Sequence, residues 1–284
     1  KLSTNMETIL SGVGDLERLA SKASSAKINP RELVQLRRGL EGVLKVAEEA
    51  AGEVALLPIL EQLSPCDSLR LRLDKELEDE APNQVGKGAV IKPGVNHELD
   101  QVRSLAFESH KALEIIREKE MGETGISSLK IGFNNVFGYY LEVRHAHKDK
   151  VPEEWIRKQT LTQAERYITE ELKVLETQIL DAKEKALTLE QRLYESLVLE
   201  TVKNTNELIG NARAMGEMDV LNCFASVALE YGYTRPRINE SHGVKIIEGR
   251  HPVIERQLPL GESYVSNNLT LDPEKAQILM VTGP

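Results

Sequence analysis

The stretch Leu172–Leu193, LKVLETQILDAKEKALTLEQRL, decides the fold of this 284-residue chain. Its apolar residues recur at alternating steps of three and four, the spacing of a stripe along one face of a long helix. This stripe consists of Leu172, Leu175, Ile179, Ala182, Ala186, Leu189 and Leu193. We expect a helix over 170–204, about 50 Å long at about 1.5 Å per residue. The spacing fits both a coiled-coil arm and a plain helical-bundle core.

Further helices are predicted before this stretch. Asn29, Pro30 and Glu32 form the start signal of a helix, in the cap, first and third positions. Asp15 is a second candidate cap. A helix from Asn96 to about Lys119 is expected to pair with the 170–204 helix and so make an arm. Its apolar positions are Leu99, Val102, Leu105 and Leu113.

A small β segment interrupts the helical pattern. In Gly125–Val143, GISSLKIGFNNVFGYYLEV, apolar and aromatic residues mark strands. Asn134 and Asn135 lie between them, where a tight turn is expected. Near the C-terminus the runs 243–255, 264–272 and 277–283 also resemble strands. The predicted fold class is therefore mainly α with a small β subdomain at the tip of long helices, followed by a few strands.

Composition narrows the function classes. The net charge of −9 does not indicate nucleic-acid binding by the chain as a whole. The two cysteines, Cys66 and Cys223, are far apart and predict neither a disulfide framework nor a zinc site. The lack of a disulfide framework fits a reducing cytoplasm better than secretion, and no apolar run is long enough for a membrane span, so we expect no membrane contact.

The β segment and the residues after it differ in charge from the rest of the chain. Residues 126–168 carry seven basic and five acidic side chains, in a chain that is acidic overall. Asn134, Asn135, Thr162 and Gln163 add short neutral donors suited to phosphate oxygens. The pattern predicts backbone contacts without base reading, although such a weakly basic surface is also typical of a solvated face.

Few residues suggest catalysis or metal binding. His145 and His147 are predicted to share one side of a strand or its end, and two ligands are too few for a metal site. The final VTGP begins as a P-loop begins, with a strand followed by Gly283, but lacks the phosphate-binding lysine. We therefore expect no catalytic residue in this chain and no metal site.

Several stretches together resemble the MutS family of DNA mismatch-repair proteins. They occur in the same order as in that family and extend over nearly the whole chain. The stretches are PRELVQLRRGL, GVNHELDQVR, TGISSLKIGFNNVFGYYLEV, RKQTLTQAERYITEELK, EGRHPVIE and the final VTGP.

The resemblance implies a domain organisation and site residues. It implies a lever over residues 1–109 and 170–233, a DNA clamp over 110–169, and the first strands of a P-loop ATPase domain over 234–284, with the chain ending inside the Walker A loop. The backbone contacts that it implies are Asn134, Asn135, Arg157, Lys158, Thr162 and Gln163. The ATP contacts that it implies in the whole protein are Tyr264, stacked on adenine, Val265 beside the base, and Gly283 at the phosphates.

The resemblance also implies partners and activity. The whole protein would be an ATPase using ATP and Mg²⁺, bind mismatched double-stranded DNA, form a homodimer with a second MutS subunit, and work with a MutL-type partner. We expect the present chain to be no enzyme, to bind nucleotide poorly and to be monomeric. Two other hypotheses stay open: a mechanical coiled-coil arm of a chromosome-associated ATPase whose tip binds a protein, and a MutS paralogue without a repair role.

Overall fold

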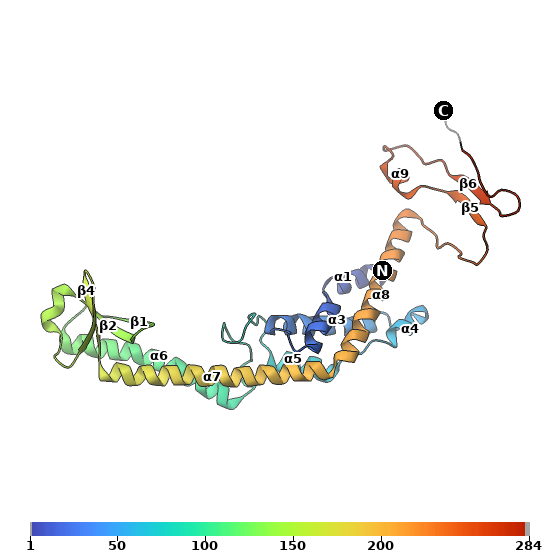
Figure 1. The fold of residues 1–284 in the computed structure, drawn as a ribbon. Coiled ribbons are helices and arrows are strands. Elements are labelled where there is room, and N and C mark those ends of the chain that lie inside the picture. Colours follow the sequence, from blue (N-terminus) through green and yellow to red (C-terminus); the bar gives the residue numbers. More distant parts are fainter. Residues whose placement is uncertain (1, 282–284) are drawn as a thin grey trace. The chain divides into compact units, whose positions relative to one another are not determined.

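A computed structural model describes residues 2–281, apart from the side chains of residues 109 and 110. It divides into two compact units, Lys1–Glu230 and Tyr231–Pro284, which are described separately. The first unit contains a helical body, a pair of long helices and a four-stranded sheet (Figure 1). The prediction of a mainly α fold with a small β subdomain is confirmed.

The helical body of the first unit is built from short and medium helices. They are α1 (Leu2–Ser11), α2 (Leu16–Ser24), α3 (Pro30–Glu49), the 3-10 turn η1 (Val54–Leu56), α4 (Leu57–Leu60), α5 (Asp67–Glu76) and the first half of α8 (Thr205–Tyr231). The Asn29 side chain accepts from the Glu32 N–H and the Glu32 carboxylate accepts from the Asn29 N–H, so the predicted capping of α3 is confirmed. The Asp15 cap of α2 is also confirmed.

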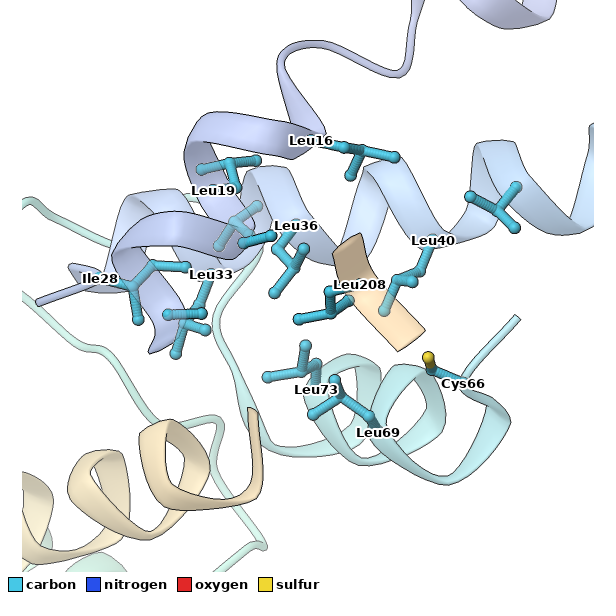
Figure 2. Close-up of a cluster of buried hydrophobic side chains, with 14 of the residues drawn as sticks. Leu16, Leu19, Ile28, Leu33, Leu36, Leu40, Cys66, Leu69, Leu73 and Leu208 are labelled. Carbon is cyan, nitrogen blue, oxygen red and sulfur yellow. The ribbon is translucent and has the colours of Figure 1, made fainter. Parts of the chain in front are cut away.

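The core of the body consists mainly of leucine side chains. Residues of α2, α3, α5 and α8 converge in one cluster, as Figure 2 shows. Leu33, Leu36 and Leu40 of α3 lie along one face, as their spacing predicts, and are fully buried. Short helices are only marginally stable in isolation. The burial of these leucine side chains is therefore the main contribution to the stability of the helices of the body.

The long helices α6 (His97–Thr124) and α7 (Glu170–Lys203) pair antiparallel beyond this body (Figure 1). All seven residues of the predicted α7 stripe are buried or half-buried, so the prediction of an inward face is confirmed. On α6, Leu99, Val102 and Leu113 are buried, whereas the prediction was wrong for Leu105, which is 56% exposed. Arg103 and Lys119 of α6 form ion pairs with Glu190 and Glu171 of α7, respectively.

Glu190 joins the helix pair to the helical body. Its side chain is buried, and its Oε1 accepts from the N–H of Val90 (2.7 Å), the N–H of Ile91 (3.1 Å) and Nη2 of Arg103 (2.6 Å). Val90 and Ile91 belong to the Gly- and Pro-rich segment after α5, in which Ile91 forms an isolated β-bridge with Leu77. One carboxylate thus fixes the connecting segment, α6 and α7 together.

The four-stranded antiparallel sheet lies between α6 and α7 in sequence. Its strands are β1 (Lys130–Asn134), β2 (Gly138–Arg144), β3 (Ile156–Thr160) and β4 (Ala164–Ile168), in the order β1-β2-β4-β3. Between β2 and β3 lies the 3-10 helix η2 (His145–Lys150). One face of the sheet packs on α6 and α7 in a second cluster around Leu141, Tyr167 and Trp155.

The two hydrophobic clusters occupy opposite ends of the helix pair. The body cluster includes Leu99 of α6 and Leu197 of α7, whereas the sheet cluster includes Leu113 of α6 and Leu172 of α7. The clusters share no residue, so the α6–α7 contact connects them. The sheet is therefore held at the far end of the helix pair (Figure 1).

The second unit contains β5 (Val244–Gly249) paired antiparallel with β6 (Asn267–Leu271), and α9 (Pro252–Gln257) between them. The prediction of one strand over 243–255 was wrong in its second half, where Pro252 begins α9. Residues 278–281 form no strand and are largely exposed, so the strand predicted over 277–283 is absent from the described part of that run. A strand needs a hydrogen-bonding neighbour, and the described residues supply none there. No helix among residues 2–281 is long and apolar enough to span a membrane.

We expect Glu190→Ala to lower the free energy of unfolding by about 3–5 kcal/mol, because it leaves two buried N–H groups and Arg103 without their acceptor. Urea unfolding followed by far-ultraviolet circular dichroism measures this change. The matched control is Glu184→Ala, an exposed glutamate of the same helix, which should cost less than about 0.5 kcal/mol. Equal unfolding midpoints for the two variants would contradict the role of Glu190.

Candidate nucleic-acid interface

The sheet has two ends that differ in their surroundings. β4 ends at Ile168 and α7 begins at Glu170, so the end of the sheet at Ile168 adjoins the helix pair. We call this the proximal end; it contains the β1–β2 turn at residues 135–137. The distal end contains η2 and the β3–β4 turn at residues 161–163. Since β2 runs from one end to the other, the ends lie about 20 Å apart.

The structure divides the predicted DNA-binding residues between these ends. Asn134 and Asn135 lie at the proximal end, whereas Thr162 and Gln163 lie in the distal turn. The Oδ1 of Asn134 accepts from the Val136 N–H (2.8 Å), which orders the proximal turn. Asn135, Thr162 and Gln163 are exposed. The six residues therefore do not form one patch.

The proximal turn depends on Gly138. Its φ of +83° is in the left-handed region, and a Cβ there would meet the Glu176 carboxylate of α7 at 1.8 Å. The turn therefore lies next to the Glu176 side chain of α7. Lys158, at a bulge in β3, lines a cavity of about 280 Å³ between this turn and α7. Asn134, Asn135 and Lys158 thus belong to the same end of the sheet.

The distal turn is fixed from η2. The His145 N–H donates to the carbonyl oxygen of Gln163 (3.2 Å), and Nε2 of His145 lies 2.9 Å from the carbonyl oxygen of Leu161. His145 directly follows the last residue of β2, as the prediction of a position at the end of a strand allows, whereas His147 lies within the 3-10 helix η2. Among the described residues, no group of three or more His, Cys, Asp or Glu side chains is placed to hold a metal ion.

Arg157 is engaged by a buried carboxylate. Its Nη1 lies 3.6 Å from Oε1 of Glu165. The same Oε1 pairs with Nζ of Lys148 (3.1 Å), and Oε2 of Glu165 accepts a hydrogen bond from the Tyr167 hydroxyl. The hydrogen bond from Tyr167 and the nearby Lys148 and Arg157 lower the pKa of Glu165. Burial, together with the Glu165 charge, raises the pKa of Tyr167 to about 12, so this hydroxyl stays a donor at neutral pH.

The face of the sheet opposite the core carries a second network. The Arg166 guanidinium lies over the Tyr140 ring and donates to Glu142 (3.2 Å) and Gln159 (2.9 Å). The Arg166 side chain is therefore already bound to other residues of the sheet. In contrast, Lys130, Arg144 and Lys158 are exposed and have no ion-pair partner within residues 2–281. These three cations are available to an anionic ligand.

Sequence reasoning missed Arg144 and Lys148 as candidate contacts. Both were counted in the local charge, but only the register places them beside the distal turn: Arg144 pairs with Ala164, the first residue of β4. Lys148 reaches Glu165 from η2. The count of basic residues was the only signal in the sequence.

The predicted nucleotide contacts lie in the second unit. Tyr264 is half-buried and Val265 is 77% exposed, in the segment between α9 and β6. A hollow of about 710 Å³ in this unit is lined by Ser266 and residues 232–234 among others, but Tyr264 and Val265 are not lining residues. Gly283 lies outside the described residues. The three nucleotide contacts therefore stay a prediction.

Taken together, the fold and the surface define a class of protein: a helical body with a paired-helix arm that carries a small sheet with exposed cations at its ends. Comparison with known families is consistent with this class. Residues 94–185 match the family model described as MutS family domain IV. This range covers α6, the sheet and the first half of α7.

Curated relatives match nearly the whole chain. The chain is 49% identical to the DNA mismatch repair protein MutS of Parabacteroides distasonis, over 98% of the chain. It is 48% identical to the MutS proteins of Christiangramia forsetii, over 100% of the chain, and of Bacteroides thetaiotaomicron, over 96% of the chain. The chain spans about a third of the length of these relatives, 32–33%. The chain belongs to the MutS family.

We expect Gly138→Ala to destabilise the sheet by about 1–3 kcal/mol, because the left-handed backbone conformation of Gly138 opposes a Cβ, whereas the flexible Glu176 side chain can move aside. Urea unfolding followed by the fluorescence of Trp155, the one tryptophan in the chain, measures this. Gly122→Ala is the matched control, because Gly122 has no left-handed φ and no atom within 4 Å of an added Cβ. If Gly138→Ala costs no more than Gly122→Ala, the left-handed conformation at Gly138 is unimportant.

The lowered pKa of Glu165 predicts a pH dependence. A carboxyl whose pKa is lower in the folded than in the unfolded state adds stability above its ordinary value of 4.5, and that stability is lost as the pH falls through the folded-state pKa. Glu165→Gln should therefore reduce the loss of stability between about pH 7 and pH 3, measured by the urea midpoint of Trp155 fluorescence. An unchanged pH dependence in this variant would contradict the interpretation.

Proposed function

We propose that this chain holds double-stranded DNA through its sugar-phosphate backbone, using the two ends of the four-stranded sheet. The observation that carries the proposal is the set of exposed cations Lys130, Arg144 and Lys158, without ion-pair partners in the described structure, on an otherwise acidic chain. The exposed Asn135 amide at the proximal turn and the exposed Thr162 hydroxyl and Gln163 amide at the distal turn supply further phosphate donors. No base-reading element enters the proposal, so the contacts are independent of sequence.

The separation of the two ends is compatible with a single duplex. DNA carries about one phosphate for every 1.7 Å of helix axis, so two ends about 20 Å apart can each meet phosphates. Asn134, Asn135 and Lys158 are the proposed proximal contacts, and Thr162 and Gln163 the proposed distal ones. Arg157 follows Ile156 at the proximal end of β3, and its half-exposed guanidinium reaches toward Glu165.

For the whole protein we propose mismatch repair in the cytoplasm. The relatives named above are mismatch repair proteins, and this supports ATP and Mg²⁺ as cofactors, mismatched DNA as ligand, and a second MutS subunit and a MutL-type protein as partners. Residues 234–284 would belong to its ATPase domain, residues 110–169 to its clamp, and residues 1–109 and 170–233 to its lever. Tyr264, Val265 and Gly283 are proposed nucleotide contacts, and the α6–α7 pair would pass nucleotide state to the sheet.

A protein-binding tip remains the second candidate. Val136 is 90% exposed and Ile156 56% exposed, both at the proximal end. Exposed apolar side chains next to a cavity are also found where proteins bind one another. Salt dependence separates the candidates, because only the DNA contact is dominated by released counterions.

We expect Arg144→Glu combined with Lys158→Glu to weaken binding of a labelled duplex about tenfold or more at low salt, because two phosphate contacts become repulsive. The slope of log affinity against log salt should also fall by about one to two. Fluorescence anisotropy at several salt concentrations measures both quantities.

The control for this prediction is a pair of charge reversals away from the sheet ends. Lys183 and Arg192 are exposed on α7, so Lys183→Glu combined with Arg192→Glu changes the net charge equally. It should leave the affinity within about twofold if the sheet ends are the contact. No binding by the parent chain at any salt concentration, or an equal loss in both double variants, would contradict the proposed interface.

A further inference from the structure

Glu165 has an unusual position for an acidic residue at a proposed phosphate-binding end. It lies on β4 near the distal turn and is only 3% exposed. Its partners come from three elements: the Tyr167 hydroxyl from β4, Nζ of Lys148 from η2, and Nη1 of Arg157 from β3. The carboxylate is thus surrounded by donors, which is how a buried charge is tolerated.

The exposure of the partners differs sharply from that of Glu165. The side chains of Lys148 and Arg157 are 54% and 56% exposed, whereas that of Glu165 is 4% exposed. An anion arriving from solvent can therefore reach both cations without meeting the carboxylate directly. However, the negative charge beneath them cancels part of their attraction for that anion.

Glu142 provides an internal comparison on the opposite face. It too is a strand glutamate paired with an arginine, but its partner Arg166 is only 20% exposed and also bonds Gln159 and stacks on Tyr140. Neutralising Glu142 consequently releases no cation to solvent. Neutralising Glu165 leaves two half-exposed cations without their shared counter-charge.

We propose that Glu165 limits the strength of phosphate binding at the distal end, by holding Lys148 and Arg157 on the sheet and cancelling part of their charge. This inference rests on the proposed function, because it concerns the same DNA backbone contact. It adds Lys148 to the set of contacts and gives Glu165 the role of a positioning residue that touches no DNA. The affinity of the chain for DNA is therefore lower than it would be if Glu165 carried no charge.

The first test compares Glu165→Gln with Glu142→Gln, which change the net charge equally within one sheet. Glutamine keeps an oxygen that accepts from the Tyr167 hydroxyl, so the fold is retained. Anisotropy titration of a labelled duplex should show about three- to tenfold tighter binding and a steeper salt slope for Glu165→Gln. Glu142→Gln should stay within about twofold of the parent. Equal effects of the two variants, or weaker binding by Glu165→Gln, would overturn the inference.

The second test leaves Glu165 unchanged. Lys148→Gln should cost less affinity than Arg144→Gln, because Lys148 is already neutralised by Glu165 whereas Arg144 has no ion-pair partner among the described residues. In the Glu165→Gln background, Lys148→Gln should cost more than it does in the parent chain. A loss for Lys148→Gln that is the same in both backgrounds would contradict the inference.

Failure of this inference can be distinguished from failure of the proposed function. If the parent chain binds DNA with a steep salt dependence but Glu165→Gln behaves as Glu142→Gln does, only the role of Glu165 is wrong. If neither the parent chain nor Glu165→Gln binds duplex DNA at low salt, the proposed function fails and this inference fails with it.

Discussion

The antiparallel contact between α6 and α7 is the constraint on which the first unit depends. It connects two hydrophobic clusters that share no residue, one around the leucines of α3 and one beneath the sheet. Apolar stripes give the contact its energy, and ion pairs fix its register: Arg103 with Glu190 near the body and Lys119 with Glu171 near the sheet. A slip of one turn along either helix would break both pairs, so register and position of the sheet are set together.

The position of the sheet explains how a mildly basic surface can attract an anionic ligand although the chain as a whole is acidic. At the far end of the helix pair, Lys130, Arg144 and Lys158 are removed from most of the acidic residues of the body. Screening at physiological salt extends over about 8 Å, so distant acidic residues hardly weaken these cations. Nearby acidic residues matter more, and Glu165 is such a residue, since it pairs with Lys148 and Arg157 of the same sheet region.

Much of the fold could be predicted from the sequence, because capping and apolar spacing are local signals. The predicted caps at Asp15 and Asn29 and the stripe of α7 are all present, and the helix expected from Asn96 begins at His97. The β3–β4 hairpin was not recognised, since β3 is an exposed edge strand with little apolar alternation and β4 buries a glutamate. The division of the site into two ends, and the capture of Arg157 by Glu165, depend on strand register, which no local pattern specifies.

The most direct test of this account is the distance from the distal turn to the body end of α7. Spin labels at Thr162→Cys and Gln191→Cys, with Cys223→Ser removing the exposed thiol, allow a pulsed electron paramagnetic resonance measurement. The account predicts one narrow distribution centred beyond about 30 Å, since α7 alone spans that length between Glu170 and Gln191. A distribution centred below about 20 Å, or one spread over the whole measurable range, would show that the helix pair does not hold the sheet away from the body.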